Sequence, residues 1–355
     1  MKGNEALAEA AIQAGCHHFF GYPITPQTEL AAYMAKRMPK IGGTYLQAES
    51  EIAAINMVLG ASAAGVRAMT SSSSPGISLK AEGISYMAGS DLPGLIINVQ
   101  RGGPGLGGIQ PSQADYWQAT KATGHGDFHI LVFAPSTVQE MVDLVARAFE
   151  KGDRYRMPAM ILADGMLGQM MEPVELPEPS EGAGDSESAS SPNKPWAACG
   201  HRGKRPHNVV NSLYLTPNAL EDLVVQRYQR YQEIEKKEQL AEEYLTEDAD
   251  ILLVAYGASA RVVRSAVNQA RSLGIKAGLV RPISLWPFPK DALVRGAKQG
   301  KDILVVEMSM GQMVEDVKLA VACKRPVHFF GHTGGIIPTP AEVLAEIRKI
   351  VSVQG

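Results

Sequence analysis

Residues 95–99, Leu-Ile-Ile-Asn-Val, form a continuous and mainly apolar run that is the best guide to the fold. Residues 130–133, Ile-Leu-Val-Phe, and residues 159–162, Ala-Met-Ile-Leu, repeat this pattern. Such runs are typical of strands that are buried on both faces. Helical patterns, including residues 51–64 and 137–151, alternate with the apolar runs. The alternation predicts an α/β fold in which helices cover both faces of a parallel sheet.

A second α/β unit is expected at residues 248–355. Its expected strands are residues 251–254, 276–283, 302–307 and 327–330, and its expected helices include residues 259–274 and a last helix from Thr339. The first unit is expected to cover residues 1–177. The chain therefore predicts two parallel-sheet domains joined by a connecting stretch, residues 178–247.

The connecting stretch begins with a change in composition. Thirteen of the 29 residues from 178 to 206 are Pro, Gly or Ser, which indicates a surface linker or insertion. A long charged helix is then expected from Pro217 to Leu245. Its narrow apolar stripe could lie across the first domain or a partner subunit, or the helix could be mostly solvated. The stripe consists of Leu220, Val224, Tyr231 and Ile234.

The charge and the apolar pattern exclude several classes of partner. Lys and Arg total 34 against 37 Asp and Glu, so the formal net charge is -3. Nucleic-acid and anionic-membrane binders rely on excess positive charge, and neither partner is expected here. No apolar stretch reaches the roughly 18 residues that a membrane span needs. The first 16 residues predict an amphipathic helix rather than a signal peptide, so a cytoplasmic protein is expected.

The cysteines and the short motifs exclude several kinds of chemistry. Cys16, Cys199 and Cys323 are far apart, so the chain should hold no iron–sulfur cluster, Cys-type zinc site or disulfide framework by itself. Residues 103–108 satisfy G-x-G-x-x-G, but Pro111 follows and no acidic residue ends the next strand. A glycine-rich active-site loop is a better interpretation than a dinucleotide site. No P-loop, G-x-S-x-G or H-E-x-x-H motif occurs.

Three positions are candidates for a functional site. The turn at residues 22–26, Tyr-Pro-Ile-Thr-Pro, places Thr25 at the carboxyl end of a short strand, where open α/β sheets bind ligands. Glu51 lies at the start of an expected helix, and Arg101 follows the most apolar strand. A carboxylate, a guanidinium and a hydroxyl at such positions can form an anion and cofactor site. Helix caps and surface charges are the alternative interpretation.

Several stretches resemble one enzyme family closely. They are residues 22–26, residues 47–61 (Gln-Ala-Glu-Ser-Glu-Ile-Ala-Ala-Ile-Asn-Met-Val-Leu-Gly-Ala), residues 70–76 (Thr-Ser-Ser-Ser-Ser-Pro-Gly), residues 98–104 (Asn-Val-Gln-Arg-Gly-Gly-Pro), residues 281–289 (Arg-Pro-Ile-Ser-Leu-Trp-Pro-Phe-Pro) and residues 307–313 (Glu-Met-Ser-Met-Gly-Gln-Met). Together they resemble the alpha subunit of thiamine-diphosphate-dependent 2-oxoacid:ferredoxin oxidoreductases. The resemblance covers essentially the whole chain except residues 178–206. It is strongest to the 3-methyl-2-oxobutanoate (2-ketoisovalerate) type, whose alpha chain is separate from a small gamma chain.

The resemblance implies a fold and a set of site residues. The fold would be a thiamine pyrimidine-binding-like domain followed by a transketolase-C-terminal-like domain. Glu51 matches the glutamate that hydrogen-bonds the aminopyrimidine ring of the cofactor and so helps to remove a proton from its thiazolium ring. Tyr22, Pro23 and Ile24 match cofactor-binding positions. Thr25 and Arg101 match groups that hold the substrate, and the planar guanidinium suits a carboxylate.

The resemblance also implies partner subunits. Thiamine enzymes hold the diphosphate and Mg²⁺ with a Gly-Asp-Gly motif, which this chain lacks. A beta subunit would supply that half of the site, and iron–sulfur clusters would lie on other partners, a gamma subunit and a ferredoxin-like delta subunit. The complex would convert a 2-oxo acid and coenzyme A to acyl-coenzyme A and CO₂ while reducing ferredoxin. A 2-oxoglutarate enzyme, an NAD-linked or transketolase-like thiamine enzyme and a non-catalytic scaffold remain alternatives.

Overall fold

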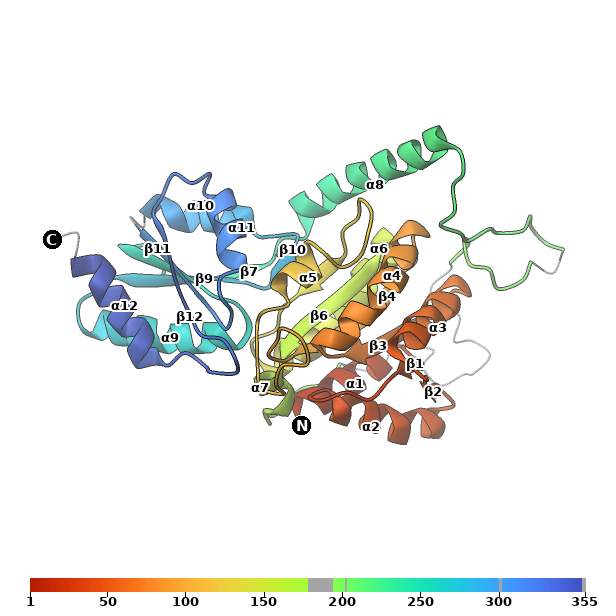
Figure 1. The fold of residues 1–355 in the computed structure, drawn as a ribbon, viewed down its shortest axis with the longest axis horizontal. Coiled ribbons are helices and arrows are strands. Elements are labelled where there is room, and N and C mark those ends of the chain that lie inside the picture. Colours follow the sequence, from red (N-terminus) through yellow and green to blue (C-terminus); the bar gives the residue numbers. More distant parts are fainter. Residues whose placement is uncertain (178–193, 202, 300–301, 353–355) are drawn as a thin grey trace.

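The computed structural model describes residues 1–177, 194–201, 203–299 and 302–352. These residues form two α/β units that lie side by side, each built around one sheet (Figure 1). Residues 178–193 and 202, which make up most of the expected linker, lie outside the described residues. The α/β fold class with two mainly parallel sheets is confirmed.

The first sheet has the strand order β10-β5-β6-β4-β3-β1-β2, and its strands β1 to β6 are parallel. Its central strand β4 is buried along its whole length, as the apolar run at residues 95–99 predicts. The strands of this unit are β1 (His18–Gly21), β2 (Thr44–Gln47), β3 (Ala68–Ser72), β4 (Gly94–Gln100), β5 (Leu131–Phe133) and β6 (Pro158–Asp164). The helices are α1 (Gly3–Gln13), α2 (Thr28–Arg37), η1 (Met38–Ile41), α3 (Glu51–Ala63), α4 (Ser74–Gly89), α5 (Tyr116–Thr120), α6 (Val138–Tyr155) and α7 (Gly165–Gln169).

The order of the strands predicts a ligand crevice between β1 and β3. From β1 the chain passes through α2 to the edge strand β2, and it returns through α3 to β3 on the other side of β1. Because parallel crossovers are right-handed, these two connections cover opposite faces of the sheet. Accordingly α2 packs on α1, whereas α3 packs on α4. A sheet that reverses its direction of winding in this way opens a crevice at the carboxyl ends of the two strands.

The second sheet has the strand order β12-β11-β8-β9-β7, and it is parallel except for β7. Its strands β8, β9 and β11 are buried on both faces. The elements from residue 217 onward are α8 (Pro217–Lys237), β7 (Ala241–Tyr244), β8 (Ile251–Val254), α9 (Gly257–Ser272), β9 (Ala277–Pro282), β10 (Ser284–Trp286), α10 (Lys290–Gln299), β11 (Asp302–Glu307), α11 (Met313–Ala320), β12 (Val327–Gly331) and α12 (Pro340–Ser352).

Two short strands correct the sequence prediction. The expected helix from Pro217 to Leu245 is wrong at its end, because α8 stops at Lys237 and residues 241–244 form β7 at the edge of the second sheet. Conversely, β10 leaves the second unit and pairs antiparallel with β5 of the first sheet. Each sheet therefore ends in one antiparallel edge strand, and the two units are tied together through β10 and the segment that follows α8.

The apolar stripe of α8 packs only in its second half. Tyr231 and Ile234 are buried against the first unit, whereas Leu220 is 43% exposed. Arg227 is buried as well, and its guanidinium binds Asp91 at 3.0 Å. The helix therefore lies across the first domain at its carboxyl end and is open to its surroundings at its beginning (Figure 1). Among the described residues, no helix combines the length and the apolar character that crossing a membrane requires.

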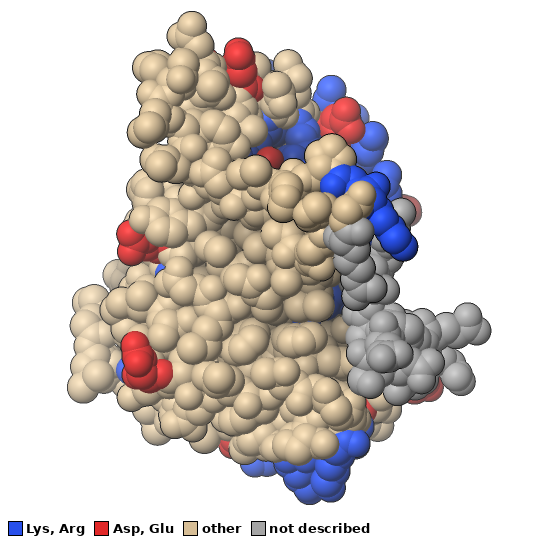
Figure 2. Space-filling view, turned by 90° about the vertical axis from the view of Figure 1, so that its right-hand side faces the viewer, with Lys and Arg blue, Asp and Glu red and all other residues tan. Residues whose placement is uncertain are grey.

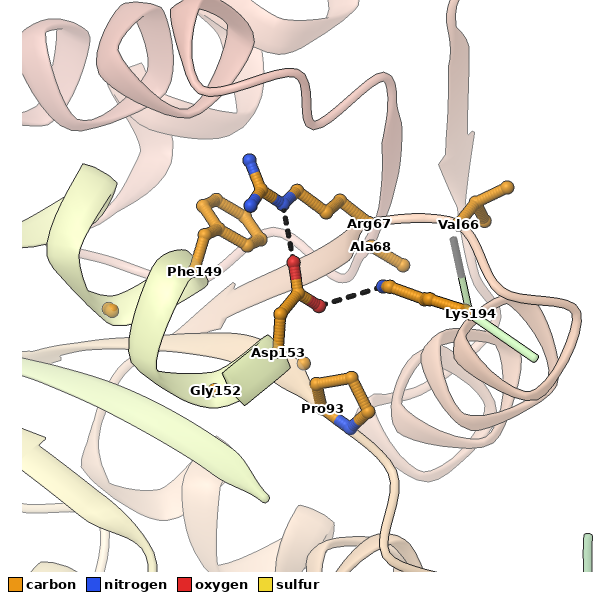
Figure 3. A pocket seen from close by; sticks show the side chains of 10 residues that line it. Val66, Arg67, Ala68, Pro93, Phe149, Gly152, Asp153 and Lys194 are labelled. Carbon is orange, nitrogen blue, oxygen red and sulfur yellow. Dashed lines mark hydrogen bonds and ion pairs between the residues drawn. The ribbon is translucent and has the colours of Figure 1, made fainter. Parts of the chain in front are cut away.

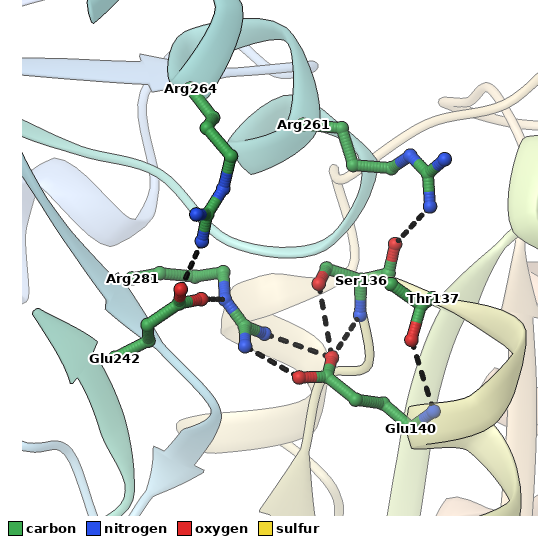
Figure 4. A network of polar contacts seen from close by, with 7 residues as sticks. All are labelled: Ser136, Thr137, Glu140, Glu242, Arg261, Arg264 and Arg281. Atoms are coloured by element: carbon green, nitrogen blue, oxygen red, sulfur yellow. Dashed lines mark hydrogen bonds and ion pairs between the residues drawn. The ribbon is translucent and has the colours of Figure 1, made fainter. Parts of the chain in front are cut away.

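A buried arginine joins the two units (Figure 4). Arg281 of β9 is 4% exposed, and its guanidinium binds the carboxylate of Glu140 on α6 at 2.5 Å. Its Nε also donates to Glu242 of β7 at 2.8 Å. Since Glu140 belongs to the first unit and Glu242 to the second sheet, this one side chain fixes the domain junction at a point where both carboxylates are partly shielded from water.

We expect Arg281→Met to lower the free energy of unfolding by about 2 kcal/mol, because it leaves the partly buried Glu140 carboxylate without its cation, while Glu242 keeps its pair with Arg264. Arg295→Met is the matched control, since the Arg295 side chain is 59% exposed where it pairs with Glu243. An exposed pair of that kind contributes at most about 0.5 kcal/mol. Urea unfolding of the full chain, followed by circular dichroism, measures both. Equal changes in the free energy of unfolding for the two substitutions would show that Arg281 does not hold the two units together.

Candidate active site

The turn at residues 22–26 follows β1 and is fixed by Gln27. The amide nitrogen of Gln27 donates to the Tyr22 carbonyl oxygen at 3.2 Å, and its amide oxygen accepts from the Ser71 hydroxyl at 2.7 Å. Gln27 is fully buried, so it anchors the turn to β3. The side chains of the turn remain largely accessible: Tyr22, Pro23 and Thr25 are exposed and Ile24 is half-buried.

Arg101 follows β4 and reaches the same turn. Its side chain is buried, and one terminal nitrogen donates to the Thr25 carbonyl oxygen at 3.0 Å. The other donates to the Leu106 carbonyl oxygen in the glycine-rich loop at 3.4 Å. The Nε atom is buried and has no hydrogen-bond partner among the residues that the structure describes. The structure thus brings Thr25 and Arg101 together through the Thr25 backbone and leaves a guanidinium N–H that a bound anion could use.

Glu51 is the first residue of α3, and the local sequence explains why. Ser50 adopts an extended conformation, and its hydroxyl accepts a hydrogen bond from the Ala53 N–H at 3.2 Å, which caps the helix. The Glu51 side chain points into the protein and is 6% exposed. Glu49, the neighbouring acidic residue, is exposed.

The Glu51 carboxylate differs from the other buried carboxylates of the described chain. Seven acidic residues are buried there: Glu9, Glu51, Asp164, Glu238, Asp302, Glu307 and Asp316. Six of them accept hydrogen bonds from neighbouring side chains or backbone N–H groups. Glu51 accepts none within the described residues. A carboxylate in a largely buried side chain that has no protein donor but keeps some accessible surface can accept hydrogen bonds from a bound molecule.

Gly76 makes room for this carboxylate. A Cβ atom on Gly76 would lie 2.7 Å from Oε1 of Glu51 and would also clash with the Ser72 hydroxyl. The next residues of this segment reach Arg101, because the Ser74 hydroxyl accepts from the Arg101 N–H at 3.0 Å. Residues 72–76 therefore lie between Glu51 and Arg101 and connect the two halves of the crevice.

Hydroxyl groups without partners line the end of β3. Thr70, Ser72 and Ser73 are completely buried, and their hydroxyl oxygens make no hydrogen bond. Buried polar atoms are normally satisfied in folded proteins. These three atoms lie at the carboxyl end of β3, and Ser72 and the Glu51 carboxylate both lie next to Gly76. With the unpartnered Nε of Arg101, they make this end of the sheet a candidate place for a polar ligand.

Comparison with protein-family models identifies the chain. Residues 9–243 match the model described as "Pyruvate flavodoxin/ferredoxin oxidoreductase, thiamine diP-bdg". Residues 249–343 match "Pyruvate:ferredoxin oxidoreductase core domain II". The chain belongs to the 2-oxoacid:ferredoxin oxidoreductase family. The resemblance drawn from the sequence is confirmed.

Curated members of this oxidoreductase family match over almost the whole chain. The ketoisovalerate oxidoreductase subunit VorB of Methanothermobacter marburgensis is 48% identical over 99% of this chain and 97% of its own length. The 2-oxoglutarate synthase subunit KorA of Methanothermobacter thermautotrophicus is 36% identical over 99% of this chain and 98% of its own.

Solved structures show the same architecture. A 2-oxoglutarate:ferredoxin oxidoreductase from Magnetococcus marinus superimposes with a TM-score of 0.83 at 27% identity. The match covers 98% of this chain, which spans 64% of that longer one. A split-gene transketolase shares the fold, with a TM-score of 0.62 at 14% identity.

The residues in the crevice fit one end of thiamine diphosphate. Its aminopyrimidine ring has an amino group that donates hydrogen bonds and ring nitrogens that accept them unless they are protonated. The Glu51 carboxylate, which accepts no hydrogen bond within the described residues, could accept one from the amino group or from a protonated ring nitrogen. Gly76 keeps this position open.

Sequence reasoning missed a polar network beneath the crevice. The Asp115 carboxylate accepts from the Ser74 hydroxyl at 2.6 Å and from the Asn98 amide at 2.9 Å. Burial raises the pKa of Asp115. Through Ser74 this network fixes the backbone of Arg101. One signal was present in the sequence: Asn98 is a polar side chain inside a strand that is otherwise buried and apolar.

Asp164, the nearest approach to a Gly-Asp-Gly motif, caps a helix. Its carboxylate accepts from the N–H groups of Met166 and Leu167 at 2.9 and 3.1 Å, at the start of α7. Burial raises its pKa to about 6. Within the described ranges, no group of three or more His, Cys, Asp or Glu side chains is arranged to hold a metal ion.

Two cavities elsewhere have structural explanations. The first, of about 10 Å³, is too small for a ligand, and Asp153 within it binds Arg67 and Lys194 (Figure 3). The second, of about 590 Å³, lies at the domain junction (Figure 4). Its arginines Arg261, Arg264 and Arg281 all pair with carboxylates. These contacts hold the two units together.

We expect Gly76→Ala to destabilise the chain by about 1–3 kcal/mol, because the added methyl group must displace Glu51 and Ser72. Gly60→Ala is the matched control. Gly60 is an exposed residue of α3 with open space around its Cβ position, so alanine should stabilise the chain by about 0.5–1 kcal/mol. Denaturant unfolding distinguishes the two. Stabilisation by both substitutions would mean that Gly76 is not needed for close contact.

Asp164→Asn should change the pH dependence of stability. The pKa of Asp164 in the folded chain, about 6, is above its unfolded value, so its contribution to stability is present at low pH and is lost as the pH rises through 6. An asparagine accepts the same helix-capping hydrogen bonds but does not ionise. The variant should be about 2 kcal/mol more stable than wild type at pH 8, and the difference should vanish near pH 4. A difference that is constant with pH would contradict this assignment.

Proposed function

We propose that the chain is the alpha-type subunit of an enzyme that converts a 2-oxo acid and coenzyme A to acyl-coenzyme A and CO₂, with ferredoxin as the electron acceptor. The observation that carries the proposal is the Glu51 side chain, which is 6% exposed, accepts no hydrogen bond within the described residues and lies next to Gly76, as the unpartnered Ser72 hydroxyl does. Family membership gives this geometry its chemical meaning.

Each site residue has a role that follows from its position. Glu51 would accept a hydrogen bond from the aminopyrimidine ring and promote proton transfer there. Tyr22, Pro23 and Ile24 would contact the ring from the turn after β1. The Thr25 hydroxyl and the Arg101 guanidinium would hold the carboxylate and carbonyl groups of the substrate. Thiamine diphosphate, when bound, supplies a nucleophilic carbon and an acceptor for the electron pair that decarboxylation releases.

Partner subunits complete the proposed enzyme. A beta subunit would bind the diphosphate and Mg²⁺, and gamma and delta subunits would carry electrons to ferredoxin through iron–sulfur clusters. Figure 2 shows that the side of the molecule with α3 carries few charged side chains. Ile52, Leu213 and Leu215 are 49%, 69% and 86% exposed. Exposed apolar side chains, together with a face that carries few charges, support a place within a larger assembly. A cytoplasmic location remains part of the proposal.

The substrate is proposed to be 3-methyl-2-oxobutanoate. The support is the 48% identity to the ketoisovalerate subunit of Methanothermobacter marburgensis, compared with 36% to a 2-oxoglutarate subunit. 2-Oxoglutarate is the second candidate. Dye reduction by the purified complex with each acid and coenzyme A tests the choice, and a higher kcat/KM for 2-oxoglutarate would reverse it.

We expect Glu51→Gln to leave assembly intact and to lower turnover by at least about 100-fold, because an amide cannot take part in the proton transfer. Glu49→Gln is the control, since Glu49 is two residues away but exposed. It should retain nearly full activity. Gel filtration of the co-expressed subunits reports assembly, and anaerobic reduction of methyl viologen reports turnover. Full activity of Glu51→Gln would refute the role of Glu51.

Two other outcomes separate the rival functions. A complex that needs NAD and a lipoyl-bearing partner in place of iron–sulfur subunits would point to a different class of thiamine enzyme. A complex that binds no thiamine and is unaffected by Glu51→Gln would point to a non-catalytic scaffold.

A further inference from the structure

A lysine is buried between the two helices that form the crevice. Gly76, Lys80 and Gly83 follow one another at spacings of four and three on α4, so they share the face that packs on α3. The contact is close: a Cβ atom on Gly83 would lie 2.5 Å from Ile55. Lys80 lies between the two glycines and is completely buried.

The ammonium group of Lys80 lies against the backbone of Glu51. Its Nζ donates to the Glu51 carbonyl oxygen at 3.3 Å, and this is its one hydrogen bond within the described residues. An ammonium group has three N–H donors, so two are left without protein partners. A methionine would fill the same space without a charge. Stability therefore gives no reason for a lysine at this position.

The charge of Lys80 acts on Glu51 in particular. Burial lowers the pKa of Lys80 to about 8, and the negative charge of Glu51 opposes that shift. The other elements around α4 present few ionisable groups to this region. The end of β3 carries the hydroxyls of residues 70–73, and β4 carries Asn98. Asp115 and Arg101 lie at the start of α4 beside Ser74, and His125 lies near its end beside Ser85.

We propose that Lys80 is a positioning residue whose positive charge keeps the Glu51 carboxylate ionised. The carboxylate can then accept a hydrogen bond from a protonated nitrogen of the bound pyrimidine ring. This inference rests on the proposed function and adds to it a residue that controls the pH range of the reaction. A buried carboxylate alone tends to take up a proton, which would remove its ability to act as an acceptor. A neighbouring cation opposes that protonation.

The proposal predicts a change in the pH profile. Without the charge at position 80, Glu51 should bind a proton at higher pH, so the acid limb of kcat/KM should move up by about one pH unit. Lys80→Met should then lower kcat/KM by up to about tenfold at pH values below the wild-type acid limb and change it little well above that limb. Lys80→Gln should behave in the same way, because it keeps a donor for the Glu51 carbonyl oxygen but lacks the charge.

The experiment uses the co-expressed complex and four variants. Lys80→Arg retains the charge and should keep the wild-type acid limb. Lys151→Met is the control, since Lys151 is also poorly exposed but pairs with Glu238 far from the crevice. It should leave the profile unchanged. An acid limb that stays in place in Lys80→Met and Lys80→Gln, while assembly is intact, would overturn the proposal.

A second measurement does not depend on the cofactor or on turnover. Lys80→Met is combined with Glu51→Gln in the full chain, and the folding equilibrium constant is obtained from denaturant unfolding at pH 7. If the two groups interact as charges, Lys80→Met should raise this constant about tenfold more in the Glu51→Gln background than in wild type. Additive effects would overturn the interaction.

The two measurements also separate failure of this inference from failure of the proposed function. A wild-type complex without 2-oxo acid oxidation would refute the function. The double-mutant cycle would still decide whether Lys80 and Glu51 are coupled.

Discussion

The close contact between α3 and α4 is the constraint on which the candidate site depends. It exists because Gly76 and Gly83 present no side chain to α3. With larger residues the helices would separate, and Glu51 would lose its position over the end of β3. The contact also explains why the carboxylate is buried although it begins a helix, a place where acidic residues are usually solvated and favoured by the helix dipole. The close packing of α3 on α4 thus determines how far the Glu51 carboxylate is shielded from water.

The sequence was sufficient for the parts of the site that lie on single elements. The alternation of buried runs and helices predicts the parallel sheet, and a parallel sheet gathers the ends of β1, β3 and β4 at one edge. Ser50 marks the start of α3, so Glu51 could be placed at a helix terminus from local rules alone. The chemical roles of Glu51, Thr25 and Arg101 came from the family resemblance and not from these patterns.

Features that depend on tertiary pairing could not be predicted in this way. β7 and β10 have four and three residues, too few to show a periodic pattern, and each pairs with a strand distant in the sequence. The acidic pattern of residues 241–244 therefore continued the charged pattern of α8. Asn98 and Lys80 were visible as residues, but their partners, Asp115 and Glu51, are assigned only when the helices and strands are packed together.

The unpartnered Glu51 carboxylate is informative because the other buried carboxylates of the described residues accept hydrogen bonds. Glu307, which is completely buried, accepts hydrogen bonds from three backbone N–H groups and a serine hydroxyl. Asp164 accepts two, and Arg281 binds two carboxylates. Among the described residues, Ser72, Ser73 and the Nε of Arg101 have buried polar atoms without partners, and the Glu51 carboxylate accepts no hydrogen bond. The proposed polar ligand would give these groups the partners that the described chain does not supply. The buried charge of Lys80 has a similar explanation. Its proposed role is to keep Glu51 ionised, and it does not serve to stabilise the chain.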